Sequence, residues 1–282
     1  MPSLHIVDLI TNTEPTLEDV RSQLCTQNQF QSPLYAKWCA EIAEVPRHHR
    51  KQWEFVYTLE ALQRFNLLRP GIRGLGFGVG TEPLPAVMAK YGCSVVATEI
   101  NIEKPHADGW MKGATVQDEM HRLNDRGICD PTVFHQNVSY RDVDMNHIPE
   151  DLKDFDFVWS CCSLEHVGSM KLASEFIINS MRCLKPGGVA IHTTEYNTNS
   201  NTFTIKKGPT VFYRRLDVIA VAQALQQEGH DIHLNLNTGR GEIDRYIDFP
   251  PYDTNKHLKL LVRYRMTSVV ATSIGLVVVK KS

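Results

Sequence analysis

The chain has 282 residues, of which 42% are hydrophobic, and a formal net charge of -2 at pH 7. Its length suffices for a sizeable core and fits one elaborated α/β domain. The near-neutral charge argues against a nucleic-acid-binding protein, which depends on a basic surface. The seven cysteines are odd in number and form no CxxC pair, which disfavours a disulfide scaffold or structural zinc site and predicts a cytoplasmic protein. We expect no membrane association, because the sequence shows neither a signal peptide nor a long apolar run.

The predicted elements start with a polar, irregular region over residues 1–46, which we interpret as an N-terminal arm or lid with a short helix at 17–24. An apolar stripe of helical period over 47–68 predicts a helix, which Pro70 and Gly71 end. Strand and helix patterns then alternate, which predicts a mostly parallel seven-stranded sheet with helices on both faces. The expected strands are 72–77, 94–98, 132–136, 155–159, 188–194, 231–236 and 273–280, and the expected helices are 83–91, 115–123, 169–183 and 211–228. Residues 47–282 are thus predicted to form one domain, with an irregular insertion at about 239–265.

A glycine loop, residues 76–80, follows the first predicted strand of this domain. Gly76, Gly78 and Gly80 remove the side chains that would keep a ligand away from the backbone of a strand-to-helix turn. Glu99 stands at the carboxyl end of the next strand, where its carboxylate can bind two ribose hydroxyls. This combination predicts a pocket for a nucleotide cofactor.

Two further segments follow the glycine loop and Glu99 along the chain. Asp144 and Met145 precede an Ile-Pro pair, and residues 184–188 read Leu-Lys-Pro-Gly-Gly before a strand. With the glycine loop and Glu99, these segments resemble the class I S-adenosylmethionine-dependent methyltransferases from about residue 52 onward. The resemblance implies a Rossmann-like α/β fold, S-adenosylmethionine as cofactor and S-adenosylhomocysteine as product. It places the glycines beneath the methionine part, Glu99 on the ribose, Asp144 on the adenine amino group and Met145 over the ring.

The chain departs from the family pattern at Gly74. Most members carry an acid at this position, where it holds the amino group of the cofactor. Glu82 or Glu54 could supply the missing carboxylate, and Arg50 or Lys51 could meet the carboxylate of the cofactor. The departure also leaves open that cofactor binding has been lost.

A Rossmann dehydrogenase is the competing enzyme class, because it also uses a glycine turn with an acid about 20 residues further on. Its fingerprint requires a third glycine three positions after the second, and Thr81 occupies that position. The other two segments have no counterpart in a dehydrogenase, so this alternative is disfavoured.

The chemistry is expected at the carboxyl end of strand 155–159, which continues into Ser160 and the segment 161–166. Ser160 is expected to contact the cofactor. Transfer of a methyl group to a hydroxyl requires alignment of the acceptor and removal of its proton. His166 is the predicted base, since an imidazole has an ordinary pKa of about 6.5, and Glu165 could orient it. Several class I O-methyltransferases resemble the stretch 160–166. The alternative is that His166 only caps the following helix.

Glu195, Tyr196 and Asn197 follow strand 188–194 and are predicted to bind the acceptor. Glu165, His166 and Glu195 could recruit a divalent ion, although the sequence lacks a compact ligand motif of the kind that identifies zinc or calcium. Aromatic, amide and acidic residues in the arm and the insertion suit a sugar, and the whole-chain pattern resembles uncharacterised glycan-type methyltransferases.

We therefore predict a methyltransferase that O-methylates a sugar, a glycan precursor or another polar small molecule. The alternatives are a small-molecule N-methyltransferase and a non-catalytic, cofactor-binding regulatory protein. Methylation of nucleic acid is disfavoured by the charge of the chain.

Overall fold

The computed structural model describes residues 9–100, 120–264 and 267–281. Within them, a ten-stranded sheet crosses the molecule in the order β1-β9-β2-β12-β8-β7-β4-β5-β6, and β11 pairs with β12. The strands are β1 Ile10–Thr11, β2 Ser22–Leu24, β4 Arg73–Phe77, β5 Ser94–Glu99, β6 Val138–Asp142, β7 Phe155–Cys161, β8 Leu184–Asn197, β9 Leu234–Asn235, β11 Leu260–Tyr264 and β12 Thr267–Val279. A separate ribbon pairs β3 His48–His49 with β10 Lys256–His257.

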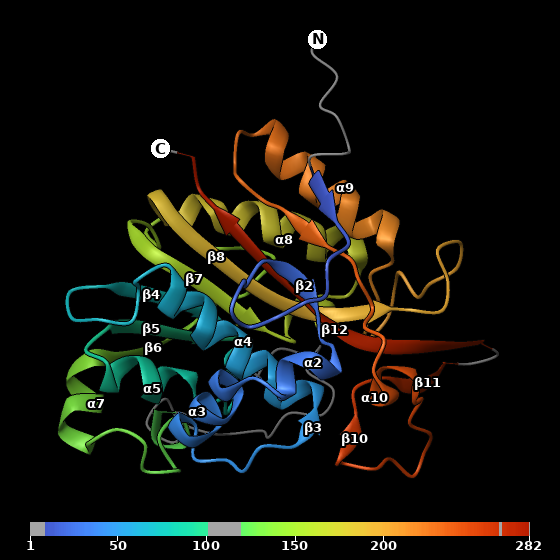
Figure 1. The fold of residues 1–282 in the computed structure, drawn as a ribbon. Coiled ribbons are helices and arrows are strands. Elements are labelled where there is room, and N and C mark those ends of the chain that lie inside the picture. The colour runs from blue at the N-terminus through green and yellow to red at the C-terminus, as the bar shows by residue number, and fades with distance from the viewer. Residues whose placement is uncertain (1–8, 101–119, 265–266, 282) are drawn as a thin grey trace.

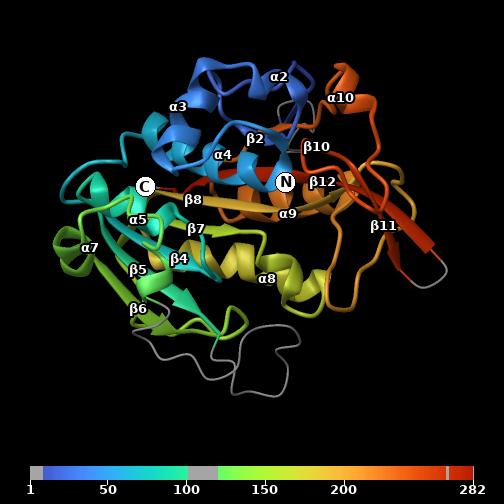
Figure 2. The same cartoon turned by 90° about the horizontal axis from the view of Figure 1, so that it is seen from below.

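Helices cover both faces of the sheet (Figure 1, Figure 2). One layer comprises α3 Pro33–Glu41, α4 Arg50–Arg64, α5 Leu84–Lys90 and α7 Pro131–Asn137, and the other comprises α8 Met170–Ser180 and α9 Arg215–Gln227. Side chains alternate along a strand, so Phe157 and Trp159 of β7 pack into the α4 core while Val158 packs into the α8 core. The predicted α/β class with helices on both faces is confirmed.

Five neighbouring strands, β6, β5, β4, β7 and β8, are all parallel. Their carboxyl ends therefore meet at one edge of the sheet. β4 pairs with β5 on one side and with β7 on the other, so the direction of chain progression reverses at β4. Ligands of open α/β sheets bind outside the carboxyl ends at such a point.

The sheet differs from the prediction in size and at one strand. Ten strands replace the predicted seven within the described residues, because short strands extend the sheet beyond β12. Residues 132–136 form helix α7 and not a strand. The Asp130 carboxylate accepts hydrogen bonds from the backbone N–H groups of Thr132 and Val133 and so caps the helix, and Pro131 occupies its first turn. The third strand of the domain instead follows as β6.

The helix expected at 17–24 is also wrong, because Ser22–Leu24 form strand β2. Leu24 pairs with Ile274 and Gln23 with Gly275 of β12, so the ladder partners lie far away in the chain. The insertion is less irregular than predicted, since it contains α10 Glu242–Arg245, β10 and β11. The arm also contains helix α2 Gln27–Phe30. The first part of the helix expected at 115–123 lies outside the described residues. Among the described helices, none is long and apolar enough to cross a membrane.

Candidate active site

The glycine loop lies at the carboxyl end of β4 and is fastened to the end of β5. Gly78 and Gly80 have positive φ angles of 61° and 48°, which glycine adopts without strain. The N–H of Gly80 donates to Glu99 Oε2 at 3.0 Å. The structure therefore brings together the loop and the carboxylate that the sequence predicted as a pair.

The packing of β4 against β7 explains the glycine at position 74. A Cβ atom at Gly74 would overlap the ring of Phe157, and one at Gly76 would overlap the indole of Trp159. Both aromatic side chains come from the neighbouring strand and lie fully buried across the glycines. An acidic side chain at position 74 would have no room. A carboxylate for the amino group of the cofactor would therefore have to come from another element.

Met145 reaches the glycine loop, since its sulfur would lie 3.4 Å from a Cβ at Gly78. The adjacent Asp144 carboxylate accepts the N–H of Asn146 at 2.9 Å and lies 3.0 Å from His147 Nδ1. Both predicted adenine-binding residues thus lie on the loop that follows β6, and Met145 faces the turn that follows β4.

Ser160 occupies a different position from the one predicted. Its side chain is fully buried, and its hydroxyl lies 2.8 Å from Nδ1 of the equally buried His192, on the α8 side of the sheet. Burial lowers the pKa of His192 to about 3. The residue that meets the glycine loop is Ser163, which donates to the carbonyl oxygen of Phe77 at 3.1 Å. Ser163 has no distinguishing sequence pattern beyond its place in the same segment.

Five ionisable side chains gather where β7 and β8 end, and we call them the charged cluster. Arg50, Lys51 and Glu54 come from the first turns of α4, Glu165 follows β7, and Glu195 lies on β8. Arg50 Nη1 lies 2.7 Å from Glu195 Oε1, and Lys51 Nζ lies 3.2 Å from the same oxygen. The side chain of Lys51 is 38% exposed, whereas Glu165 and Glu195 are almost completely buried.

Several polar atoms of the charged cluster have no hydrogen-bond partner among the described residues. These atoms are Arg50 Nε, Glu165 Oε1 and Glu195 Oε2, and all three are buried. The other oxygen of Glu165 accepts the hydroxyl of Thr194 at 3.1 Å. An unsatisfied buried polar atom is costly and calls for an explanation. A bound ligand that donates hydrogen bonds to the two carboxylate oxygens and accepts one from Arg50 Nε would supply one.

Two of the three acids of the cluster, Glu165 and Glu195, have pKa values that move in opposite directions. Burial raises the pKa of Glu165, and the ammonium of Lys51 only partly offsets this. Burial alone would also raise the pKa of Glu195, but Arg50 and Lys51 outweigh it and hold that pKa below its ordinary value. Such divergence between neighbouring carboxyls is a feature of sites that carry out acid-base chemistry.

His166 lies at the rim of the cluster with 48% of its side chain exposed. Nδ1 lies 2.7 Å from the carbonyl oxygen of Pro209 and must donate its proton to that oxygen. This bond leaves Nε2 as the basic nitrogen, 3.9 Å from Glu165 Oε1. The predicted pair of Glu165 and His166 is therefore adjacent in space.

The three residues predicted to bind the acceptor after strand 188–194 have different surroundings in the structure. Glu195 enters the charged cluster, whereas Tyr196 packs into the α8 core, and burial raises its pKa to about 12. The Asn197 side chain donates to the carbonyl oxygen of Phe203 and accepts the N–H of Asn199. The polar groups of Asn197 thus hold the following loop.

One group within the described part of the chain has the spacing to hold a metal ion. The ligand atoms of Cys162, Glu165 and Glu195 all lie within 4.8 Å of one another. His166, which the sequence analysis placed in this set, is replaced there by Cys162. The ammonium of Lys51 lies 3.9 Å from Glu165 Oε1 and 3.2 Å from Glu195 Oε1, so a side-chain cation already lies beside these carboxylates.

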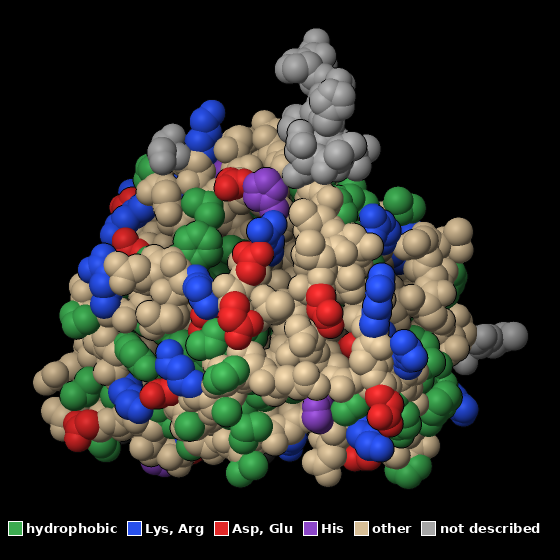
Figure 3. All heavy atoms as spheres, in the orientation of Figure 1, with side chains coloured by type: hydrophobic (Ala, Val, Ile, Leu, Met, Phe, Trp, Pro, Cys, Tyr) green, Lys and Arg blue, Asp and Glu red, His purple; other side chains and the backbone are tan. Residues whose placement is uncertain are grey.

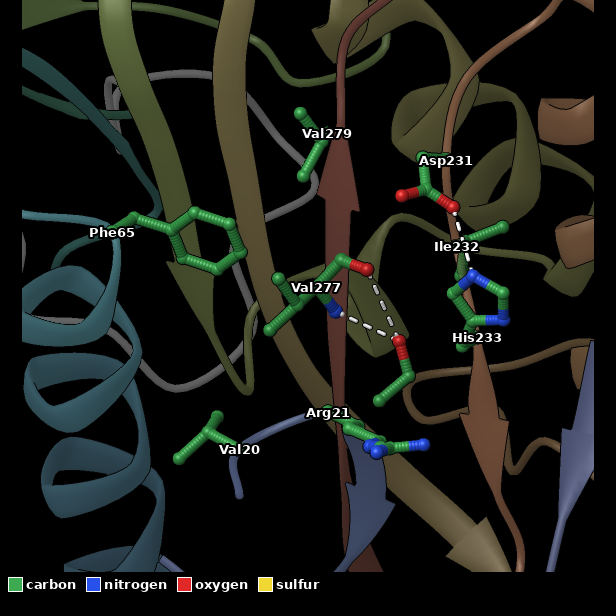
Figure 4. A pocket seen from close by; sticks show the side chains of 9 residues that line it. Val20, Arg21, Phe65, Asp231, Ile232, His233, Val277 and Val279 are labelled. Carbon is green, nitrogen blue, oxygen red and sulfur yellow. Dashed lines mark hydrogen bonds and ion pairs between the residues drawn. The ribbon is translucent and has the colours of Figure 1, made fainter. Parts of the chain in front are cut away.

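A separate small pocket lies along β2 and β12 (Figure 4). Phe65, Val277 and His233 are among its lining residues, and its volume is about 130 Å³. Typical ligand pockets have about 300–1,000 Å³. Val277 and Val279 belong to the end of β12 that pairs with the start of β8, so this pocket lies away from the glycine loop.

The fold is a Rossmann-like α/β fold with a glycine loop at the switch point of its sheet and the charged cluster at the same edge. A family model described as a methyltransferase domain matches residues 47–242. The chain belongs to this family, which confirms the predicted class I S-adenosylmethionine-dependent methyltransferase. Sequence comparison with curated proteins gave no significant match.

Several solved structures are similar to this chain. A putative methyltransferase from Bacillus halodurans C-125 is 13% identical, with a TM-score of 0.49, over 79% of this chain and 99% of that one. Magnesium protoporphyrin IX methyltransferase from Synechocystis PCC 6803, with bound S-adenosylhomocysteine, is 13% identical, with a TM-score of 0.47, over 82% and 83%. A putative sarcosine dimethylglycine methyltransferase from Galdieria sulphuraria is 19% identical, with a TM-score of 0.37, over 53% of this chain and only 47% of that protein.

Proposed function

We propose that the protein transfers the methyl group of S-adenosylmethionine to a hydroxyl of a sugar, a glycan precursor or another polar small molecule. The observation that supports this most is the pair of unpaired carboxylate oxygens, Glu165 Oε1 and Glu195 Oε2, buried where β7 and β8 end. Each oxygen requires a donor, and a hydroxyl acceptor provides one. Both oxygens lie at the edge of the sheet that also carries the glycine loop, which fits a site for the acceptor.

The residues around the glycine loop fit the cofactor. We propose that Gly76, Gly78 and Gly80 lie beneath its methionine part, since a side chain at Gly78 would fill space beside Ser163 and Met145. In this proposal Glu99 binds the ribose, Asp144 binds the adenine amino group, Met145 covers the ring, and Ser163 replaces Ser160 as the contact from β7. The bound cofactor supplies an electrophilic methyl group on a sulfonium.

Removal of the acceptor proton is assigned to Glu165 and His166. Glu165 Oε1 accepts a hydrogen bond from the hydroxyl and positions its oxygen, because its other carboxylate oxygen is fixed by Thr194. The hydroxyl proton passes along this hydrogen bond to Glu165 Oε1, and His166 Nε2, 3.9 Å away, takes it from the carboxyl and passes it to solvent from its half-exposed ring. Glu195, held by Arg50 and Lys51, binds a second hydroxyl through its free oxygen.

The charge of the cluster limits the acceptor. Three carboxylates face two cations, so the site carries an excess of negative charge in a buried setting. A neutral hydroxyl fits this setting, whereas an anionic group at the reacting position would meet repulsion. A phosphate of a nucleotide sugar would therefore have to lie outside the cluster. On the face shown in Figure 3, acidic and basic side chains are interspersed, which fits a small acceptor better than a nucleic acid.

N-methylation of a small amine is the second candidate, because an ammonium or amine N–H also satisfies the unpaired oxygens. The test is a mass-spectrometric screen of neutral sugars, nucleotide sugars and small amines with S-adenosylmethionine. We expect turnover on a hydroxyl acceptor, a fall of at least about 100-fold in kcat for Glu165→Gln, and unchanged affinity for S-adenosylhomocysteine in that variant. Turnover on amines alone would assign the second function, and cofactor binding without any turnover would support a regulatory protein.

A further inference from the structure

Glu82 is a buried acid that the chemistry proposed above does not use. It follows the glycine loop, is only 6% exposed, and its Oε1 accepts the indole N–H of Trp159. Among the described residues, no Lys, Arg or His forms an ion pair with its carboxylate. A buried carboxylate without a cation is unusual, because burial of charge needs a compensating partner.

The position of Glu82 follows from the glycines of β4. The indole of Trp159 lies across Gly76, where any side chain would overlap it, and its N–H is thereby directed at the Glu82 carboxylate. The Phe157 ring closes the space at Gly74 in the same way. The aromatic residues of β7 thus fill the region beneath the loop and hold one carboxylate at its edge.

We propose that Glu82 binds the ammonium group at the methionine end of the cofactor, in place of the acid that position 74 cannot carry. This assignment rests on the cofactor placement proposed above. The ammonium would supply the cationic partner that the carboxylate lacks. Charge-assisted hydrogen bonds of this kind are about twice as strong as neutral ones.

Glu54, the other acid considered for this role, is already engaged. Its oxygens accept the hydroxyls of Thr193 and Ser273, and Arg50 and Lys51 lie 3.8 Å and 3.6 Å from Glu54 Oε1. An incoming ammonium would have to compete with two side-chain cations there. Glu82 offers a site without that competition.

A proton should leave the protein when the cofactor binds. Burial raises the pKa of Glu82 well above its ordinary value, and the charges of Glu99 on β5 and Glu54 on α4 add to this increase. Hydrogen bonds from Trp159 and Cys161 on β7 partly offset it. An adjacent ammonium favours the ionised carboxylate, so binding lowers this raised pKa again and favours release of a proton from Glu82.

The test is calorimetric titration with two ligands, S-adenosylhomocysteine and 5′-methylthioadenosine, which shares the adenosine and thioether but lacks the amino acid end. We expect Glu82→Gln to lower the affinity for S-adenosylhomocysteine by at least about 10-fold and to leave the affinity for 5′-methylthioadenosine unchanged. The matched control is Glu99→Gln, which should lower the affinity for both ligands. Titrations in buffers of different ionisation enthalpy should show proton release by the wild type and none by Glu82→Gln.

Other outcomes overturn the assignment. Equal losses for both ligands in Glu82→Gln, or no loss, would exclude the ammonium contact, and a selective loss in Glu54→Gln alone would move it to that residue. If Glu82→Gln does not fold, Trp159→Phe keeps a smaller aromatic ring at this position and removes the indole N–H. Trp159→Phe should then lower the affinity for S-adenosylhomocysteine more than that for 5′-methylthioadenosine. Equal effects on the two affinities would refute the proposal. A wild type that binds neither ligand would instead refute the cofactor placement itself.

Discussion

Arg50→Met should destabilise the protein strongly, because Arg50 is the most deeply buried cation of the charged cluster. The guanidinium and its partner Glu195 are only 7% and 6% exposed at their side chains, and the ion pair measures 2.7 Å. Removal of one member of a buried pair costs about 3–5 kcal/mol, because it leaves the other charge uncompensated. We expect a value near the lower end, about 3 kcal/mol, since Lys51 still lies 3.2 Å from Glu195 Oε1.

The loss should depend on pH. In the wild type, burial would raise the pKa of Glu195, but Arg50 and Lys51 hold it below the ordinary 4.5. A carboxyl with a depressed folded-state pKa stabilises the protein above its unfolded pKa, and this contribution disappears as pH falls through the folded value. Without Arg50 only Lys51 opposes the effect of burial, so the pKa of Glu195 is higher than in the wild type and Glu195 is protonated at a higher pH. The loss of unfolding free energy in the variant should therefore be largest at neutral pH and should become smaller as pH falls toward the ordinary carboxyl pKa.

Urea unfolding of wild type and Arg50→Met, at neutral pH and at about pH 5, measures this deficit. Lys51→Met is the matched control. Its side chain is 38% exposed, so solvent screens its charge and we expect a loss of only about 0–1 kcal/mol. Equal losses in the two variants, or a deficit for Arg50→Met that does not shrink in acid, would refute the buried-pair argument.

Two further predictions concern the scaffold of the site. Gly76→Ala places a methyl group against the indole of Trp159, so we expect a loss of about 1–3 kcal/mol in chemical denaturation together with weaker S-adenosylhomocysteine binding. A variant of wild-type stability would show that Trp159 can move aside. Asp130→Ala removes the side-chain cap of α7 and should cost about 0.5–2 kcal/mol; unchanged thermal stability would mean that the cap contributes nothing.

The sequence by itself determined the elements that depend on local chemistry. The glycine loop, Glu99 at the end of its strand, and the amphipathic helix now seen as α4 are each specified by residues within a few positions of one another. The alternation of strands and helices then fixed the parallel sheet and the edge at which the site lies. Glu165 and Glu195 were predicted as site residues because both stand near strand ends at that edge.

Tertiary structure decided the features that depend on distant partners. Strand β2 exists because β12 supplies its ladder, and no periodicity over three residues could reveal it. Lys51 meets Glu195 across 144 positions of the chain, and the aromatic rings of β7 decide that position 74 must be glycine. Patterns along a chain report neighbours within a turn or a strand. Burial, charge pairing and the space left for a side chain are set only when distant segments pack together.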